Sequence, residues 1–204
     1  MTFQMTRTFF GLSLLVGLSL FFAGCQAFGA TYEFNGTVLE PPPALPDFEL
    51  TAANGQPFHL SDVSGDFALI YFGYTYCPDV CPLTMTDVKE ALAELEGRER
   101  VHVIFISVDP ERDTPEVLQH YVNAFDASFI GLTDNFDKTL AVMKPYGAFA
   151  EKEETPDSAA GYLMSHTARL YLVNPRRELI LTYPFGFEPE DLRRDLTYLL
   201  QQES

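Results

Sequence analysis

The sequence predicts an α/β fold in which a central sheet is flanked by helices. The apolar runs "FALIYFGY" (67–74) and "VHVIFISV" (101–108) are typical of strands that are buried on both faces. Between and after these runs, apolar residues recur at helical spacing, so strands and helices alternate along the chain. Such alternation favours a largely parallel α/β sheet.

The elements before and after the first buried strand are predicted from local signals. "FELTAANGQPFHL" (48–60) contains Asn54-Gly55 between two short strand-like pieces, which predicts an N-terminal β-hairpin. After the run 67–74, a helix that stops near Gly97 is expected. Its inward face would carry Met85, Val88, Leu92 and Leu95.

Two further helices and a short strand follow the second buried strand. The segment 113–125 is expected to be a helix, with Thr114 as its N-cap and Pro115 in its first turn. "FIGLT" (129–133) predicts a short strand, and 135–147 predicts a helix that ends near Pro145.

The last part of the chain predicts how the sheet is completed. "EKEETPDSAAG" (151–161) has the composition of an acidic loop. "TARLYLV" (167–173) and "ELILTY" (178–183) predict a closing pair of strands, and 188–200 predicts an amphipathic final helix. A closing pair of strands followed by a helix favours a thioredoxin-like arrangement, with a central mixed sheet flanked by helices and an N-terminal β-hairpin.

Size and charge limit the classes of function. A chain of 204 residues is long enough for one globular domain with a sizeable core, plus extensions at its ends. The net charge is −16, so the surface repels nucleic acid, and no nucleic-acid partner is expected.

The N-terminus predicts export. Arg7 precedes the apolar stretch "TFFGLSLLVGLSLFFAGC", which is shorter than the roughly 20 residues of a typical transmembrane helix. A basic start followed by an apolar stretch and small residues is typical of a secretory signal. An uncleaved signal anchor is the alternative. In both cases the domain would lie outside the cytoplasm and be held at a membrane.

The end of the apolar stretch resembles the lipobox of bacterial lipoproteins. In "FAGC" the lipidated residue would be Cys25, with Phe22 where leucine is usual. We therefore expect a signal peptide at 1–24, a lipidated Cys25 with a proline-rich tether at 25–46, and the folded domain at 47–204. The tether contains "PPPALP", which favours an extended conformation.

The two remaining cysteines form a close pair. With Cys25 assigned to lipid, Cys77 and Cys81 are the cysteines left for the exported domain. A disulfide that closes so small a loop stabilises a fold little by loop entropy. The pair is therefore interpreted as chemical rather than as a structural staple.

Position makes this pair reactive. Each cysteine precedes a proline, which disfavours helical backbone, so the helix is expected to begin at Pro82 with Cys81 near its N-cap. The thiols then lie between the carboxyl end of a strand and a helix N-terminus, where ligands bind in open α/β sheets. The helix dipole there favours thiolate, the form that attacks disulfides and binds soft metals.

Three residues separate the cysteines, which leaves room for a metal with a further ligand as well as for a disulfide. The chain offers four histidines: His59, His102, His120 and His166. His166 follows the acidic loop and precedes a closing strand, so we favour it, although a solvated loop histidine fits that position equally. Two thiolates and an imidazole suit copper in both oxidation states, and zinc is an alternative. Met85 and Met164 are further soft donors, but a methionine is more often part of the core.

Three stretches resemble the Sco/SenC family of thioredoxin-like copper proteins over about residues 44–201. They are "NGQPFHLSDVSGDFALIYFGYTYCPDVCPLTM", "FISVDPERDTPEVLQHY" and "HTARLYLVNP". The resemblance implies copper bound by Cys77, Cys81 and His166. It also implies a role in assembling the binuclear copper A centre of cytochrome c oxidase, with the copper A-bearing subunit as partner and another copper chaperone or a thiol reductant as a second one.

The sequence leaves three functions open. The first is a copper metallochaperone, and the second is a thiol–disulfide oxidoreductase, an enzyme that would keep the copper-binding cysteines of the oxidase reduced. The third is a copper or redox sensor. Asp79 and Asp109 are acidic candidates for supporting the ligands, and a capping or solvated role fits each of them equally well.

Overall fold

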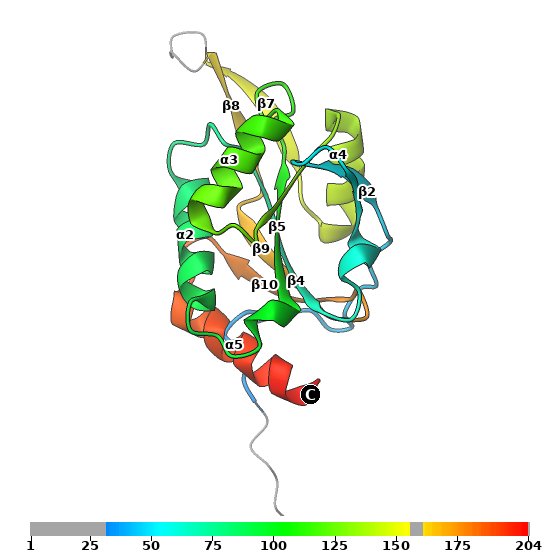
Figure 1. The fold of residues 1–204 in the computed structure, drawn as a ribbon, viewed down its shortest axis with the longest axis vertical. Helices are drawn as coiled ribbons and strands as arrows, with labels where there is room; N and C mark the ends of the chain where they lie inside the picture. The colour runs from blue at the N-terminus through cyan, green and yellow to red at the C-terminus, as the bar shows by residue number, and fades with distance from the viewer. Residues whose placement is uncertain (1–31, 156–160, 204) are drawn as a thin grey trace, which may run out of the picture. The chain divides into compact units, whose positions relative to one another are not determined.

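The computed structural model describes residues 32–155 and 161–203. Its main sheet has eight strands in the order β1-β10-β9-β4-β5-β6-β2-β3 (Figure 1). The strands are β1 (Thr37–Val38), β2 (Glu49–Ala52), β3 (Pro57–His59), β4 (Phe67–Gly73), β5 (Val101–Ser107), β6 (Ile130–Thr133), β9 (Arg169–Val173) and β10 (Leu179–Pro184).

The sheet is mixed, as predicted, but it is not largely parallel. Only the pairs β4–β5 and β5–β6 of this sheet are parallel. The closing hairpin β9–β10 lies antiparallel to β4, and the β2–β3 hairpin lies antiparallel to β6 at the other edge. Within the described residues, the main sheet has five antiparallel strand pairings and two parallel ones. Local periodicity does not reveal which strands pair, so it did not predict this balance.

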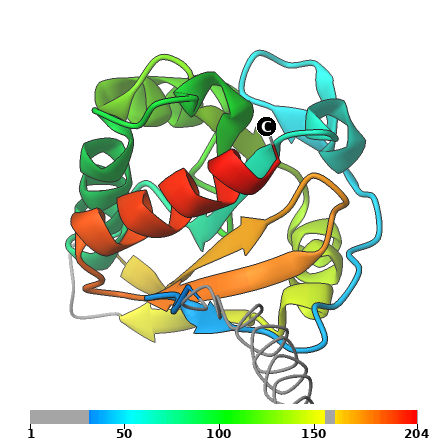
Figure 2. The same ribbon diagram turned by 90° about the horizontal axis from the view of Figure 1, so that it is seen from below.

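Helices cover both faces of the sheet. They are α2 (Val80–Leu92), α3 (Pro115–Phe125), α4 (Phe136–Met143) and α5 (Pro189–Gln202). Helix α2 packs beside α3 and α5, and Figure 2 shows α4 on the opposite face. Every residue of β4 is buried, which explains why its sequence is a continuous apolar run.

The packed unit begins at Phe34, earlier than the predicted boundary at Asp47. Strand β1 pairs with β10, and the side chain of Leu45 is 5% exposed. The buried carboxylate of Asp195 accepts hydrogen bonds from the backbone N–H of Gly36 and from the Tyr183 hydroxyl. Much of the predicted tether is therefore part of the domain. The predicted signal peptide at 1–24 and Cys25 lie outside the described residues.

The predicted acidic loop is instead a β-hairpin. Strands β7 (Ala150–Thr155) and β8 (Gly161–His166) pair antiparallel, from Ala150 opposite His166 to Thr155 opposite Gly161. This hairpin forms a separate two-stranded sheet, seen at the upper end of Figure 1. No helix in residues 32–155 or 161–203 is long and apolar enough to cross a membrane.

Candidate metal and thiol site

The two cysteines lie where β4 connects to α2. Helix α2 begins at Val80 with Asp79 as its N-cap residue, so the predicted start at Pro82 is two residues late. Cys81 lies inside the first turn, and Pro82 follows it there. This is tolerated because the first backbone N–H groups of a helix have no acceptor within the helix, so a proline removes no hydrogen bond.

The two thiols and the imidazole of His166 meet at this turn. The Cys81 backbone N–H donates to Cys77 Sγ over 3.4 Å, and Cys81 Sγ lies 3.6 Å from His166 Nε2. Both cysteines are free thiols, with Cys81 buried and Cys77 half-buried. The Tyr71 hydroxyl donates to Cys81 Sγ over 3.8 Å. The fold therefore brings together the three residues singled out from the sequence.

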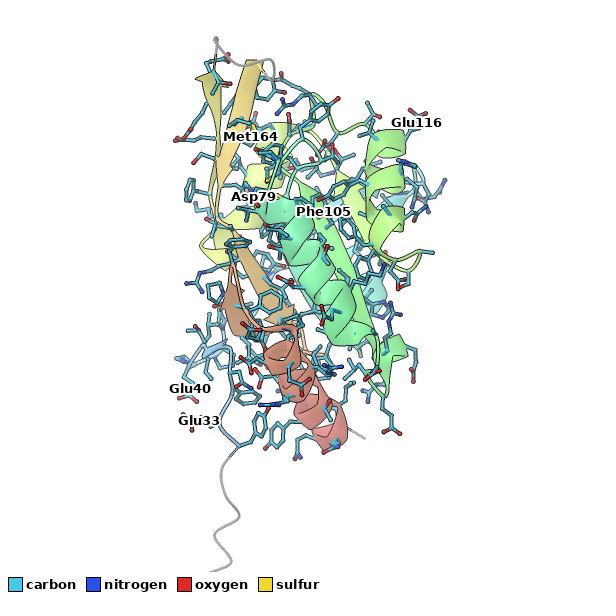
Figure 3. The ribbon with its side chains drawn as sticks, turned by 90° about the vertical axis from the view of Figure 1, so that its left-hand side faces the viewer. Glu33, Glu40, Asp79, Phe105, Glu116 and Met164 are labelled. Atoms are coloured by element: carbon cyan, nitrogen blue, oxygen red, sulfur yellow. The ribbon has the colours of Figure 1, made fainter. Side chains whose placement is uncertain are left out.

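Aromatic rings fix the plane of His166, the last residue of β8. Its ring makes edge-on contacts with Tyr71 at 6.2 Å and Tyr74 at 5.8 Å between centroids. Its Nδ1 atom is buried without a hydrogen-bond partner, and Nε2 faces the sulfur of Cys81. Figure 3 labels Met164 on β8 and Asp79 at the start of α2, the two elements that bring imidazole and thiols together.

The two thiols have opposite pKa shifts. The hydrogen bond from the Cys81 thiol, followed by one from His166, lowers the pKa of Cys77 to about 4, against the opposing effect of burial. The hydrogen bond with Cys77, burial and the negative charge on Cys77 all raise the pKa of Cys81. The pair therefore holds one proton on the buried sulfur and a thiolate on the accessible one.

A buried carboxylate that the sequence analysis missed anchors the cysteine loop. Asp113 accepts from the Thr75 backbone N–H at 3.1 Å, the Thr75 hydroxyl at 2.6 Å and the Ser107 hydroxyl at 2.5 Å. Burial raises the pKa of this carboxyl in spite of these bonds. Asp113 thus connects Thr75, which lies two residues before Cys77, to Ser107 at the end of β5. The signal for this role was the acid-rich stretch "DPERDT" directly after a buried strand.

Of the two acidic candidates, Asp79 is exposed, and its side chain makes no capping hydrogen bond. Its backbone, however, contributes a hydrogen bond to Cys77. Asp109 is 2% exposed and accepts from Arg112 Nε at 2.5 Å and the Tyr162 hydroxyl at 2.8 Å. The Asp109 carboxylate therefore bonds Arg112 and Tyr162, which are neighbours of the site, rather than the Cys or His side chains.

The other candidate donors lie elsewhere. His59 pairs with Glu49, and His102 pairs with Asp66. His120 is exposed on α3. Met85 and Met164 are buried in the core cluster. In residues 32–155 and 161–203, no three His, Cys, Asp or Glu side chains are already spaced to hold one ion, so coordination by all three donors requires side-chain movement.

Comparison with known proteins decides the family. The SCO1/SenC family model matches residues 37–201. This chain belongs to the SCO1/SenC family. Among SCO1/SenC relatives, the SCO2-like protein of Rickettsia felis is 32% identical over 148 residues, which cover 72% of each chain. Protein SCO2 of Saccharomyces cerevisiae mitochondria is 35% identical over 135 residues, which are 65% of this chain but only 45% of the yeast protein.

Solved SCO1/SenC structures have the same thioredoxin-like fold. The copper-bound ScoI of Bradyrhizobium japonicum is 35% identical, with a TM-score of 0.69, and the match covers 77% of this chain and 99% of that one. The copper-bound ScoI of Arabidopsis thaliana is 29% identical, with a TM-score of 0.72, and covers 78% and 99%. These matches confirm the predicted fold class.

Proposed function

We propose that this protein is a copper metallochaperone that holds copper through Cys77, Cys81 and His166. The observation that carries the proposal is the 3.6 Å contact between Cys81 Sγ and His166 Nε2, beside a Cys77 whose pKa is lowered to about 4. Thiolate and imidazole together are ligands that copper prefers over hard cations.

Two of the three donors, Cys81 and His166, are spaced as ligands of one metal ion. Bond lengths of about 2.3 Å to sulfur and about 2.0 Å to nitrogen place two ligands of one tetrahedral ion about 3.5 Å apart. The Cys81–His166 distance is of that size, and Nε2 is the nitrogen that faces the sulfur. Cys77 is half-buried in the loop before α2, so its side chain can turn to complete the site.

Membership in the SCO1/SenC family supports copper as the bound ion. Two relatives with 29% and 35% identity were solved with copper bound. The acceptor that we propose is the copper A site of cytochrome c oxidase, on the subunit that carries that centre. A second copper chaperone would supply the ion, or a thiol reductant would keep the cysteine pair reduced.

Metal titration tests copper binding directly. The reduced chain from residue 26 is expected to bind one copper ion, because two thiols and one imidazole converge at a single place. Replacing both cysteines by serine, Cys77→Ser with Cys81→Ser, should reduce the copper content to near zero. We expect circular dichroism to show an intact fold. If the double variant still binds one equivalent, copper lies elsewhere and the proposal is wrong.

The second candidate function is thiol–disulfide exchange with the cysteines of the oxidase. The observation that favours it is the asymmetry of the pair, with an accessible Cys77 of low pKa beside a buried Cys81 of raised pKa. Such a pair supplies an attacking thiolate and a second thiol that can resolve a mixed disulfide. Exchange does not need His166, which separates this function from copper delivery.

We also propose that the protein is an exported lipoprotein anchored through Cys25 on the outer side of the cell membrane. The support is the sequence "FAGC" at the end of the apolar stretch. Mass spectrometry of the mature protein should find Cys25 as a lipid-modified N-terminus, and Cys25→Ser should abolish the modification. A mature chain that retains Met1, or that begins elsewhere without lipid, would refute this assignment.

A further inference from the structure

The position of His166 depends on how the β7–β8 hairpin is held. In the described part of the chain, β7 and β8 pair with each other and not with the eight-stranded sheet. His166 is the last residue of β8, so a tilt of the hairpin would move the imidazole relative to Cys77 before α2 and Cys81 in its first turn. Contacts that dock this hairpin on the rest of the domain therefore determine the geometry of the site.

Arg112 provides such contacts, from the turn that follows β5. Its Nε donates to Asp109 at 2.5 Å, and its Nη1 donates to the backbone carbonyl of Tyr162 on β8 at 3.1 Å. Its guanidinium lies 3.7 Å from the centroid of the Tyr162 ring and 4.8 Å from that of Tyr76, the residue before Cys77. One side chain thus touches both the hairpin and the cysteine loop.

The neighbours of Arg112 strengthen the same connection. The Tyr162 hydroxyl donates to Asp109 at 2.8 Å, so hairpin and guanidinium share one carboxylate that is 2% exposed. The Arg112 side chain is itself only 15% exposed. Lys152 on β7 covers the Tyr162 ring at 3.9 Å and pairs with Glu111. The Lys152–Glu111 pair is largely open to solvent, so it stabilises the docked hairpin less than the buried Arg112–Asp109 pair does.

We propose that Arg112 is a positioning residue that docks the β7–β8 hairpin and thereby holds His166 against Cys77 and Cys81. The planar guanidinium of Arg112 donates hydrogen bonds to a carboxylate and a carbonyl and also stacks on aromatic rings. The ammonium group of lysine cannot make this combination of contacts. Arg112 is hydrogen-bonded to the hairpin that carries His166, whereas it meets the cysteine loop through the ring of Tyr76, so we expect its loss to affect the imidazole more than the thiols. This inference rests on the proposed copper site.

The test compares Cu(II) with Cu(I) in the full-length chain. Arg112→Lys keeps the positive charge but loses the planar guanidinium, and we expect it to weaken Cu(II) binding about 10-fold, the lower end of the range for groups bonded directly to a ligand. Cu(I), which two thiolates satisfy, should change less than about threefold. Tyr162→Leu, which removes the ring from the hairpin side, should give the same split. Arg98→Lys, which changes a surface pair with Asp126, is the matched control and should bind both ions as wild type does.

The outcomes separate this inference from the proposed function. If His166→Ala weakens Cu(II) but Arg112→Lys and Tyr162→Leu bind it like wild type, the positioning role is wrong and the copper site stands. If Arg112→Lys and Tyr162→Leu weaken Cu(I) and Cu(II) binding equally, they act through a general loss of structure, and the positioning role of Arg112 is again wrong. If His166→Ala itself leaves Cu(II) binding unchanged, the proposed ligand set fails first.

Discussion

Replacing His166 by alanine is expected to weaken Cu(II) binding by more than about 100-fold, because loss of a direct ligand costs more than loss of a supporting partner. Cu(II) prefers surroundings that contain nitrogen, whereas Cu(I) can be satisfied by the two thiolates of Cys77 and Cys81. Titration of the reduced domain with each ion measures the difference. His120→Ala, at an exposed position on α3, is the control and should bind as wild type does.

The same variant distinguishes delivery from thiol exchange in cells. If the protein delivers copper, cells with His166→Ala should lose oxidase activity about as severely as cells with Cys77→Ser, and added copper should restore part of it. Disulfide formation needs only the two cysteines and access to them. A normal oxidase in His166→Ala cells, together with a defective one in Cys77→Ser cells, would exclude copper delivery and leave thiol–disulfide exchange as the function.

At pH 7, iodoacetamide is expected to modify Cys77 and to leave Cys81 untouched. The pKa of Cys77 is lowered to about 4, so nearly all of it is thiolate, compared with about 3% for an ordinary thiol of pKa about 8.5. Cys81 is buried and its pKa is raised. Labelling followed by peptide mass spectrometry should show a rate at Cys77 that is flat from pH 9 to about pH 5 and falls near pH 4.

Removal of the hydrogen bond between Cys81 and Cys77 should shift the pH dependence of labelling at Cys77. Cys81→Ala takes away the largest cause of the low pKa, so the reactivity of Cys77 should move toward neutral or higher pH. Cys81→Ser keeps a hydroxyl donor and should retain part of the shift. A rate at Cys77 that titrates near pH 8.5 in the wild type would contradict the proton sharing described above.

The lowered pKa also links stability to pH. A thiol whose pKa is lower in the folded than in the unfolded chain stabilises the fold above its unfolded pKa of about 8.5. That contribution is lost as the pH falls from about 8.5 through about 4, the pKa of Cys77 in the folded protein. Chemical denaturation of wild type and Cys77→Ser across this range measures the contribution of the coupled pair, because Cys77 also raises the pKa of Cys81.

Local patterns predicted most of the elements well. The N-cap Thr114 accepts from the backbone N–H of Val117, as expected for a helix that begins with proline. The hairpin around Asn54-Gly55 forms with Glu49 opposite His59. Turn formers, caps and runs of apolar residues act over a few positions, so each could be read without its neighbours in space.

Elements that depend on distant partners were predicted poorly. Strand β7 contains four charged residues and has no apolar alternation, because its partner is β8 and much of it faces solvent. Residues 34–46 have the composition of a tether, because the strand that they pair with, β10, and the carboxylate that accepts their hydrogen bonds, Asp195, both lie near the other end of the chain. Both segments are ordered by pairing with other strands, so their own sequences do not predict their structure.

The donor groups of the site could be read from the sequence alone: two thiols with three residues between them at the start of a helix, and an imidazole just before a closing strand. The tertiary structure places His166 Nε2 3.6 Å from Cys81 Sγ. It also brings Asp113 to the loop before Cys77 and Arg112 to the hairpin that carries His166. The physical reason is that side-chain identity is a local property, whereas the distance between residues 85 positions apart is set by packing. Hydrogen-bond partners and the opposite pKa shifts of the two thiols follow from that packing, so they could not be predicted from the spacing of the cysteines.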